Sequence, residues 1–364
     1  MEGPRPPQPE EMADVISFVD QQLRPQENWS VGEEYPQAFH PNNVKNIRII
    51  RDEKGIQAHA LMKYSLTKTP VGLFKAAVIG SVVTAPEARG QGLSRSIIEN
   101  CLTEAQTQGC DLAILWSDLF DFYQKLGFEL AGQEVNLLIE DPWDLPLPPG
   151  VRFVKDNKVA SEALLKLYTQ HRVGCIRTPE DIRNYLRIPN SHLYTLWSAN
   201  NELLAYAVEG KGADLKDHIH EWGGGVQEII LLLTQVRRSL GRPIRVMAPA
   251  HSQNLIRQMV SHGAKTQNGW LGLIKILNLQ NILGKVHRYA RTLGIADLVL
   301  ENSSEGYVLG FGENLFQISS EVDLLRLLFG PHKASHFKAL DSQTATTLEE
   351  LLPLPLWFWG WDSV

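Results

Sequence analysis

The chain has 364 residues, of which 43% are hydrophobic and 21% are charged, and its formal net charge is −6. This composition is typical of a soluble globular chain that is long enough for two or three domains. The acidic balance argues against nucleic acid as a partner, because proteins that bind polyanions usually carry a basic surplus.

The cysteine pattern and the hydropathy argue against further classes. Cys101, Cys110 and Cys175 form no Cys-x-x-Cys pair, and the histidines show no zinc-ligand spacing, so we expect neither disulfides nor a metal. No apolar run approaches the roughly 20 residues that span a bilayer. The amino-terminal segment lacks the apolar core of a secretory signal. These features predict a cytoplasmic protein with no membrane partner.

The first 140 residues show alternating strand and helix patterns. The predicted segments are, in chain order, a helix over 10–23, a hairpin over 47–64 with its turn at 53–55, a strand over 75–84 with a bulge at Gly80, a helix from 93 to Gly109, a strand over 112–117, and a short helix over 120–129 that breaks at Gly127. Their order predicts an α/β fold with a mixed sheet and helices on its faces.

The rest of the chain divides at a proline-rich linker over residues 141–150. We therefore predict a first domain over 1–140, a second over 151–275 and a third over 276–364. The second domain repeats the pattern of the first, which indicates a diverged internal duplication. Its predicted segments are a hairpin over 192–210, a strand over 218–224, a helix over 226–241, a strand over 244–250 and a helix over 252–263.

The third predicted domain has a different pattern. A helix over 279–294 precedes two strand-like segments, 296–311 and 313–319, and a helix through Leu324, Leu325 and Leu328 follows. The last residues, "LLPLPLWFWGWDSV", are aromatic and contain two prolines that favour an extended chain. We predict a small α+β domain with an extended aromatic tail.

The segment "PEARGQGLSRS", residues 86–96, joins a predicted strand to a predicted helix. A helix N-terminus presents free backbone N–H groups, and glycines let an oxyanion approach them closely. The segment therefore suits a phosphate or pyrophosphate cradle, with charge from Arg89. The backbone amides that would line it belong to Gly90, Gln91, Gly92, Leu93 and Ser94.

Three motifs in this region resemble those of the GCN5-related N-acetyltransferases, the GNAT superfamily. Arg89, Gly92 and Ser94 fill the positions of R/Q-x-x-G-x-G/A, although glycine or alanine is usual where Ser94 stands. "SVVTAPEA" resembles the preceding V-x-V-x-P-x-x strand. "FYQKLGFEL" resembles Y-x-x-x-G-F, with Tyr123 as its tyrosine. The resemblance covers about residues 75–130.

The resemblance implies an acetyl-CoA-dependent enzyme that transfers an acetyl group directly to a primary amine of a small molecule or a peptide. A backbone N–H of Val82 or Thr84 would stabilise the developing oxyanion. Tyr123 would be the general acid that protonates the CoA thiolate. Two rival functions remain at this stage: a non-catalytic acyl-CoA sensor, and a transferase that takes its acyl group from an aminoacyl-tRNA. The acceptor and the oligomeric state, including a homo-oligomer, stay open.

The general base is not evident from the residues, with Glu33, Glu34, His59 and Asp118 as candidates. The whole-chain layout resembles the enhanced-intracellular-survival type of acetyltransferase: tandem GNAT folds, the second degenerate, and a C-terminal domain like a sterol carrier protein. That resemblance implies that the terminal carboxylate of Val364 enters the site as the base. The alternative is that the aromatic tail only seals a domain interface.

The second copy lacks the acetyl-CoA motif. Its strand-to-helix junction, "EWGGGVQE", has Glu221 and Glu228 beside the glycines, and a carboxylate there would repel a pyrophosphate. Glu221 and Trp222 could line an acceptor pocket, or this half could be structural. We interpret His218 and His220 as a surface pair, and we do not expect Cys175 to be a nucleophile.

Overall fold

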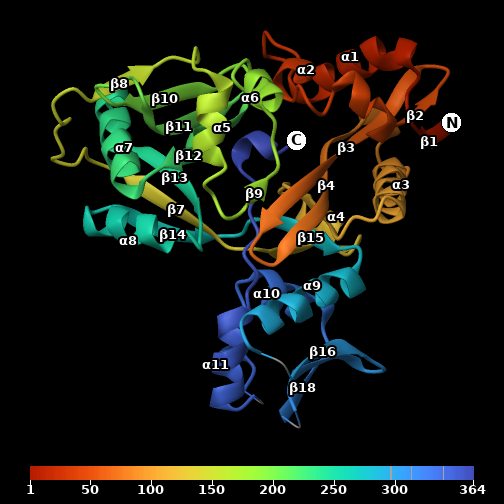
Figure 1. Ribbon diagram of the computed structural model, residues 1–364. Helices are drawn as coiled ribbons and strands as arrows, with labels where there is room; N and C mark the ends of the chain where they lie inside the picture. The colour runs from red at the N-terminus through yellow and green to blue at the C-terminus, as the bar shows by residue number, and fades with distance from the viewer. Residues whose placement is uncertain (296, 313, 339) are drawn as a thin grey trace.

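The computed structural model describes residues 1–295, 297–312, 314–338 and 340–364. These residues form three β-sheets, carried by two large lobes and a smaller C-terminal lobe (Figure 1). Among the helices of these residues, none has the length and apolar character needed to cross a membrane.

The first lobe, called the first unit, follows the predicted order of elements. Its segments are β1 (Glu2–Arg5), α1 (Met12–Leu23), α2 (Val31–Glu34), β2 (Ile47–Asp52), β3 (Gly55–Thr69), β4 (Gly72–Thr84), α3 (Leu93–Thr107), β5 (Leu112–Leu115), α4 (Phe120–Gln124) and β6 (Glu129–Ala131). The predicted hairpin turn at 53–55 is confirmed, because β2 pairs antiparallel with β3. One stripe of α3 is buried against the sheet: Ile97, Ile98, Cys101, Leu102 and Ala105.

The second lobe, the second unit, repeats this order. The chain from the end of the first unit contributes β7 (Glu134–Ile139), β8 (Arg152–Lys155), α5 (Ser161–Tyr168), β9 (Gly174–Cys175), α6 (Pro179–Tyr185), β10 (His192–Trp197), β11 (Leu203–Lys211), β12 (Asp214–Gly224), α7 (Val226–Leu240), β13 (Ile244–Pro249), α8 (Gln253–Ser261), β14 (Lys265–Gly269) and β15 (Gly272–Ile276). As in the first unit, three antiparallel strands precede a helix and a strand parallel to the third. The predicted duplication is therefore visible as two α/β units of one topology.

Strands cross between the two units in both directions. The first sheet runs β1-β2-β3-β4-β5-β15-β6, with β9 beside β3, and the second runs β14-β7-β13-β12-β11-β10-β8. β15 thus lies between β5 and β6 of the first unit, and β7 lies between β13 and β14 of the second. The domain boundaries at residues 140 and 275 stay a prediction. Hydrophobic periodicity identifies a strand but not the sheet that it joins, so it does not predict this exchange of β7 and β15.

The C-terminal lobe contains α9 (Leu279–Thr292), β16 (Leu298–Ser303), β17 (Gly306–Phe311), β18 (Asn314–Ile318), α10 (Glu321–Phe329) and α11 (Ser342–Leu351). Its first predicted strand segment is two strands, because the chain turns at Gly306, whose φ is +126°. Residues 296 and 313, where the two predicted segments begin, lie outside the described residues. Likeness of this lobe to a sterol carrier protein stays a prediction.

The exchanged strand β7 supplies a test of pH-dependent stability. Burial raises the pKa of the Glu134 carboxyl from 4.5 to about 7. Between these values the folded chain keeps a proton that the unfolded chain has lost, so the free energy of unfolding falls as pH rises through that window. We expect Glu134→Gln to remove this pH-dependent fall in the free energy of unfolding. The variant's Tm should exceed that of the wild type by a few degrees at pH 8, on the order expected for such shifts, and not at pH 4.5.

The control for this measurement is Glu140→Gln, which changes an exposed carboxylate paired with Lys265 just beyond the same strand. It should show no growing stabilisation between pH 4.5 and pH 8. Equal Tm differences for Glu134→Gln at both pH values would contradict the expectation.

Candidate functional site

Strands β4 and β5 separate part-way along the first sheet. β5 pairs in parallel with β4 only at Ala76–Val78, although β4 continues to Thr84. On the other side of β4, Ser81 and Val82 lie opposite the single residue Ala60, which is a β-bulge beside the predicted position Gly80. Ser81 has a φ of +49°, which is rare for a residue other than glycine. The sheet therefore opens at the bulge and leaves part of the backbone of β4 without a neighbour in β5.

The glycine loop lies at the end of β4. Gly90 and Gly92 have φ values of +78° and +76°, and an added Cβ at either position would meet open space. Gly92 is the residue that precedes the first turn of α3, so the loop exposes the free N–H groups of a 15-residue helix. A cavity of about 260 Å³ lies over it, with this lining: Thr84, Ala88, Arg89, Gly90, Gly92, Leu93, Ser94, Arg95 and Phe122.

The polar side chains of the loop are arranged around Thr84. Its hydroxyl lies 2.6 Å from the hydroxyl of Ser94, and the Nε of Arg89 donates to its carbonyl at 3.4 Å. The contact between the Thr84 and Ser94 hydroxyls connects the end of β4 to the first turn of α3. Arg89 and Gln91 are exposed, so their polar groups are free to reach a ligand above the loop.

Tyr123 lies on α4 with its ring buried between Phe122 and Phe128, at centroid distances of 4.9 and 5.9 Å. Burial raises the pKa of the Tyr123 phenol to about 12. The phenol is therefore protonated at neutral pH, which is the state required of a proton donor.

Val364 lies against Gly80 at the bulge. An added Cβ at Gly80 would stand 2.1 Å from the main-chain oxygen of Val364 and 2.4 Å from its carbonyl carbon. In Figure 1 the chain end lies between the two large units, away from the rest of the C-terminal lobe. The predicted strand bulge at Gly80 and the chain end at Val364 thus lie in contact. They are 284 residues apart in the sequence (364 minus 80).

Residues 4–131 match the family model described as the acetyltransferase (GNAT) domain. This match covers the first unit of the chain, from β1 to β6.

Three solved structures share this fold over nearly the full chain. A GCN5-related N-acetyltransferase from Anabaena variabilis has a TM-score of 0.68 at 13% identity and covers 99% of each chain. A probable N-acyltransferase from Enterococcus faecalis has a TM-score of 0.65 at 16% identity and covers 98% of this chain and 97% of that one. Eis1 from Mycobacterium abscessus has a TM-score of 0.64 at 10% identity and covers 99% of each. No curated protein matches the chain in sequence.

The aromatic tail that leads to Val364 is buried. Trp357, Phe358, Trp359 and Trp361 are each at most 4% exposed. Trp359 packs edge-on against Trp222 at 4.9 Å, and Trp361 stacks on Tyr185 at 5.4 Å. The tail thus packs against the second unit, and its end lies against Gly80 of the first unit. The role of Val364 as a base stays a prediction.

The acidic and imidazole candidates for the base have different surroundings. Glu34 is fully buried in an ion pair with Arg24, with an N–O distance of 2.6 Å. Glu33 accepts from the backbone of Ser30 at the start of α2, and Asp118 is exposed. These contacts give Glu33 and Glu34 structural roles.

His59 is the base candidate that lies nearest the bulge in the strand register, because it pairs with Val83 of β4. Its Nδ1 lies 2.7 Å from the carbonyl oxygen of Ser81, and its buried Nε2 has no hydrogen-bond partner among the described residues. Burial lowers the pKa of the His59 imidazole to about 4, so the ring is neutral at pH 7. The ring supports the bulge through its contact with Ser81.

In the second unit, the junction between β12 and α7 contains the carboxylate of Glu228. An added Cβ at Gly225, which precedes the first turn of α7, would stand 2.2 Å from a carboxylate oxygen of Glu228. Glu221 and Trp222 are buried and do not line the second unit's open surface. The carboxylate of Glu228 therefore lies at the start of α7, the junction that corresponds in chain order to the glycine loop of the first unit.

One prediction about a side chain changes with the structure. The interpretation of His220 as a surface residue is wrong, because it is 1% exposed and its Nε2 lies 2.9 Å from the carbonyl of Gly210. His218 and His220 would share one face of a regular strand, but the register between β11 and β12 shifts between Glu221 and Ile219, so His220 lies at an irregularity of β12. Cys175 is also buried, and burial raises the pKa of its thiol, which keeps it protonated.

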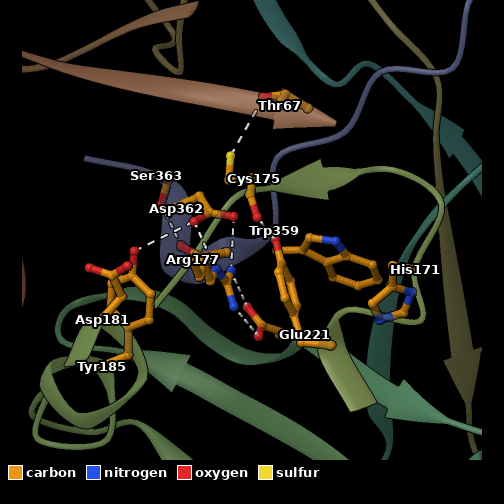
Figure 2. A network of polar contacts seen from close by, with 12 residues as sticks. Thr67, His171, Cys175, Arg177, Asp181, Tyr185, Glu221, Trp359, Asp362 and Ser363 are labelled. Atoms are coloured by element: carbon orange, nitrogen blue, oxygen red, sulfur yellow. Dashed lines mark hydrogen bonds and ion pairs between the residues drawn. The ribbon is translucent and has the colours of Figure 1, made fainter. Parts of the chain in front are cut away.

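The sequence gives no local signal for a buried ion cluster between the second unit and the tail (Figure 2). Arg177 donates to both carboxylate oxygens of Glu221, at 2.6 and 2.8 Å, and to both of Asp362, at 3.0 and 2.8 Å. Lys211 donates to the main-chain oxygen of Ser363 at 2.6 Å. Each residue resembles an ordinary charged surface position until the fold brings residues 177, 211, 221 and 362 together.

Proposed function

We propose that the protein is an acetyl-CoA-dependent N-acetyltransferase that acts on a primary amine of a small molecule or an exposed peptide amine. The observation that carries the proposal is the glycine loop at the end of β4, with its cavity and its left-handed Gly90 and Gly92, within a GNAT unit. These residues fit a pyrophosphate, because free N–H groups at a helix N-terminus favour a bound anion.

The reaction needs a donor for the thioester oxygen and a proton for the leaving thiolate. Acetyl-CoA would supply the acetyl thioester, and the amine would form its C–N bond as the C–S bond breaks. A backbone N–H of Val82 or Thr84, beside the bulge, would donate to the developing oxyanion. The phenol of Tyr123 would give its proton to the CoA sulfur.

We further propose that the main-chain carboxylate of Val364 removes the proton from the attacking amine. Its place against Gly80 supports this role over the other acidic candidates, because Glu33 and Glu34 are engaged in structural contacts. A carboxylate held at the bulge would stand beside the strand that directs the thioester.

The proposed function is tested by binding and turnover measured separately. Calorimetry with acetyl-CoA should show binding, and an amine panel should give free thiol only when an acceptor is present. Arg89→Ala should weaken acetyl-CoA binding by about tenfold, on the order of one charge-assisted contact. Arg257→Ala, an exposed arginine on α8, should not.

The outcomes separate the proposal from its rivals. Binding of acetyl-CoA without turnover on any amine would favour an acyl-CoA sensor. Acyl transfer from aminoacyl-tRNA but not from acetyl-CoA would favour the tRNA-dependent transferase. No binding of acetyl-CoA at millimolar concentration would end the proposal.

A further inference from the structure

The second unit holds the last residues of the chain through a buried ion cluster. Arg177 follows β9, the short strand that pairs with β3 of the first unit, and its guanidinium lies between two carboxylates. Glu221 belongs to β12 of the second unit, and Asp362 belongs to the tail. Figure 2 shows these two carboxylates on opposite sides of Arg177. All three side chains are at most 1% exposed.

Lys211 is a second contact from the same unit. It ends β11, and its ammonium donates to the main-chain oxygen of Ser363 at 2.6 Å, to the Ser363 hydroxyl at 2.9 Å and to the Gly360 carbonyl at 3.1 Å. Lys211 is 1% exposed. Its contacts therefore hold both ends of the short turn at Gly360–Asp362.

Apolar burial alone does not account for this arrangement. The tryptophans of the tail give it affinity for the second unit, but apolar contact is non-directional. Two paired N–H···O contacts from Arg177 fix the direction of Asp362, because the guanidinium is planar and its donors are rigid. Val364 follows Asp362 by only two residues, so this direction also sets the place of Val364 at Gly80.

We propose that the degenerate second unit serves as the anchor of the chain end, with Arg177 and Lys211 as positioning residues for the reaction in the first unit. This inference rests on the proposed function of Val364. It assigns to the second unit the task of orienting a group at the site of the first, in place of binding its own acetyl-CoA.

The first experiment measures amide hydrogen exchange and needs no activity. In Asp362→Asn and Lys211→Met, we expect the amides of residues 360–364 to exchange at least about tenfold faster, as the local opening is favoured. The amides of α3 and β4 should keep their wild-type rates. Lys216→Met, an exposed lysine of β12, is the matched control and should leave the tail unchanged.

The second experiment measures turnover in the same variants of the full chain. We expect kcat to fall by about tenfold or more while the Kd for acetyl-CoA stays within about twofold, because the glycine loop is untouched. Arg177→Met combined with Asp362→Asn should be no worse than the more affected single variant, since the two side chains act through one contact. Arg183→Met, an exposed arginine of α6, is the control for that substitution.

The two experiments distinguish the failure of the anchor from the failure of the proposed function. Unchanged tail exchange in both Asp362→Asn and Lys211→Met would overturn the anchor, whatever the activity. Faster tail exchange with undiminished kcat would overturn the positioning role. The wild-type chain could show no turnover while amide exchange in the tail becomes faster in the variants as expected. That result would contradict the proposed function and leave the structural anchor standing. If Arg177→Met does not fold, the other two variants still decide the result.

Discussion

Converting the main-chain carboxylate of Val364 to an amide is expected to lower kcat by about 10²–10⁴-fold, the usual contribution of a positioned proton acceptor. The amide keeps the length and side chain of Val364, so the tail should stay packed and the Kd for acetyl-CoA should not change. The variant is made by ligating a synthetic tail peptide, and the same ligation with a free acid is its control. Single-turnover thiol release measures the chemical step.

The same contact can be disturbed from the strand. Gly80 has no left-handed φ, so alanine fits its backbone, but the added methyl would stand 2.1 Å from the Val364 oxygen. We expect Gly80→Ala to displace the chain end and lower kcat. Gly284→Ala, in α9, is the control, because its methyl would meet Arg288 at an ordinary 3.6 Å. Full activity of the amidated chain would rule out Val364 as the base, and His59 would then be the next candidate.

Tyr123→Phe is expected to reduce kcat by about 10²–10⁴-fold through loss of the proton donor to the CoA sulfur. The ring keeps its packing between Phe122 and Phe128, so the Tm should change little. The loss should be smaller with an acyl donor whose leaving thiol has a low pKa, because that thiolate needs no proton.

Tyr64→Phe is the matched control for this prediction. It also removes a phenol from the first unit, and the Tyr64 hydroxyl is buried without a hydrogen-bond partner among the described residues. Its kcat should equal that of the wild type. A Tyr123→Phe variant with wild-type kcat for every acyl donor would show that the thiolate leaves without this acid.

Much of the candidate site was predictable from short segments. The loop from Arg89 to Ser94 combines left-handed glycines with a helix start, and both are local properties of the backbone. Tyr123 was also predictable, because its spacing to Gly127 and Phe128 lies within one short helix and turn. These features depend on neighbours within a few residues.

The sequence by itself determined the two repeated units, the glycine loop and the apolar tail, because hydrophobic periodicity and turn residues act over short separations. Only the tertiary structure decided that β7 joins the second sheet and β15 the first. Only the tertiary structure also decided that Arg177 contacts Asp362, which lies 185 residues further along the chain. The hydrophobic pattern of a strand does not depend on which sheet the strand joins. The sequence likewise does not show whether an arginine side chain is solvated or buried. Their partners are selected by the packing of the whole chain, which no local pattern contains.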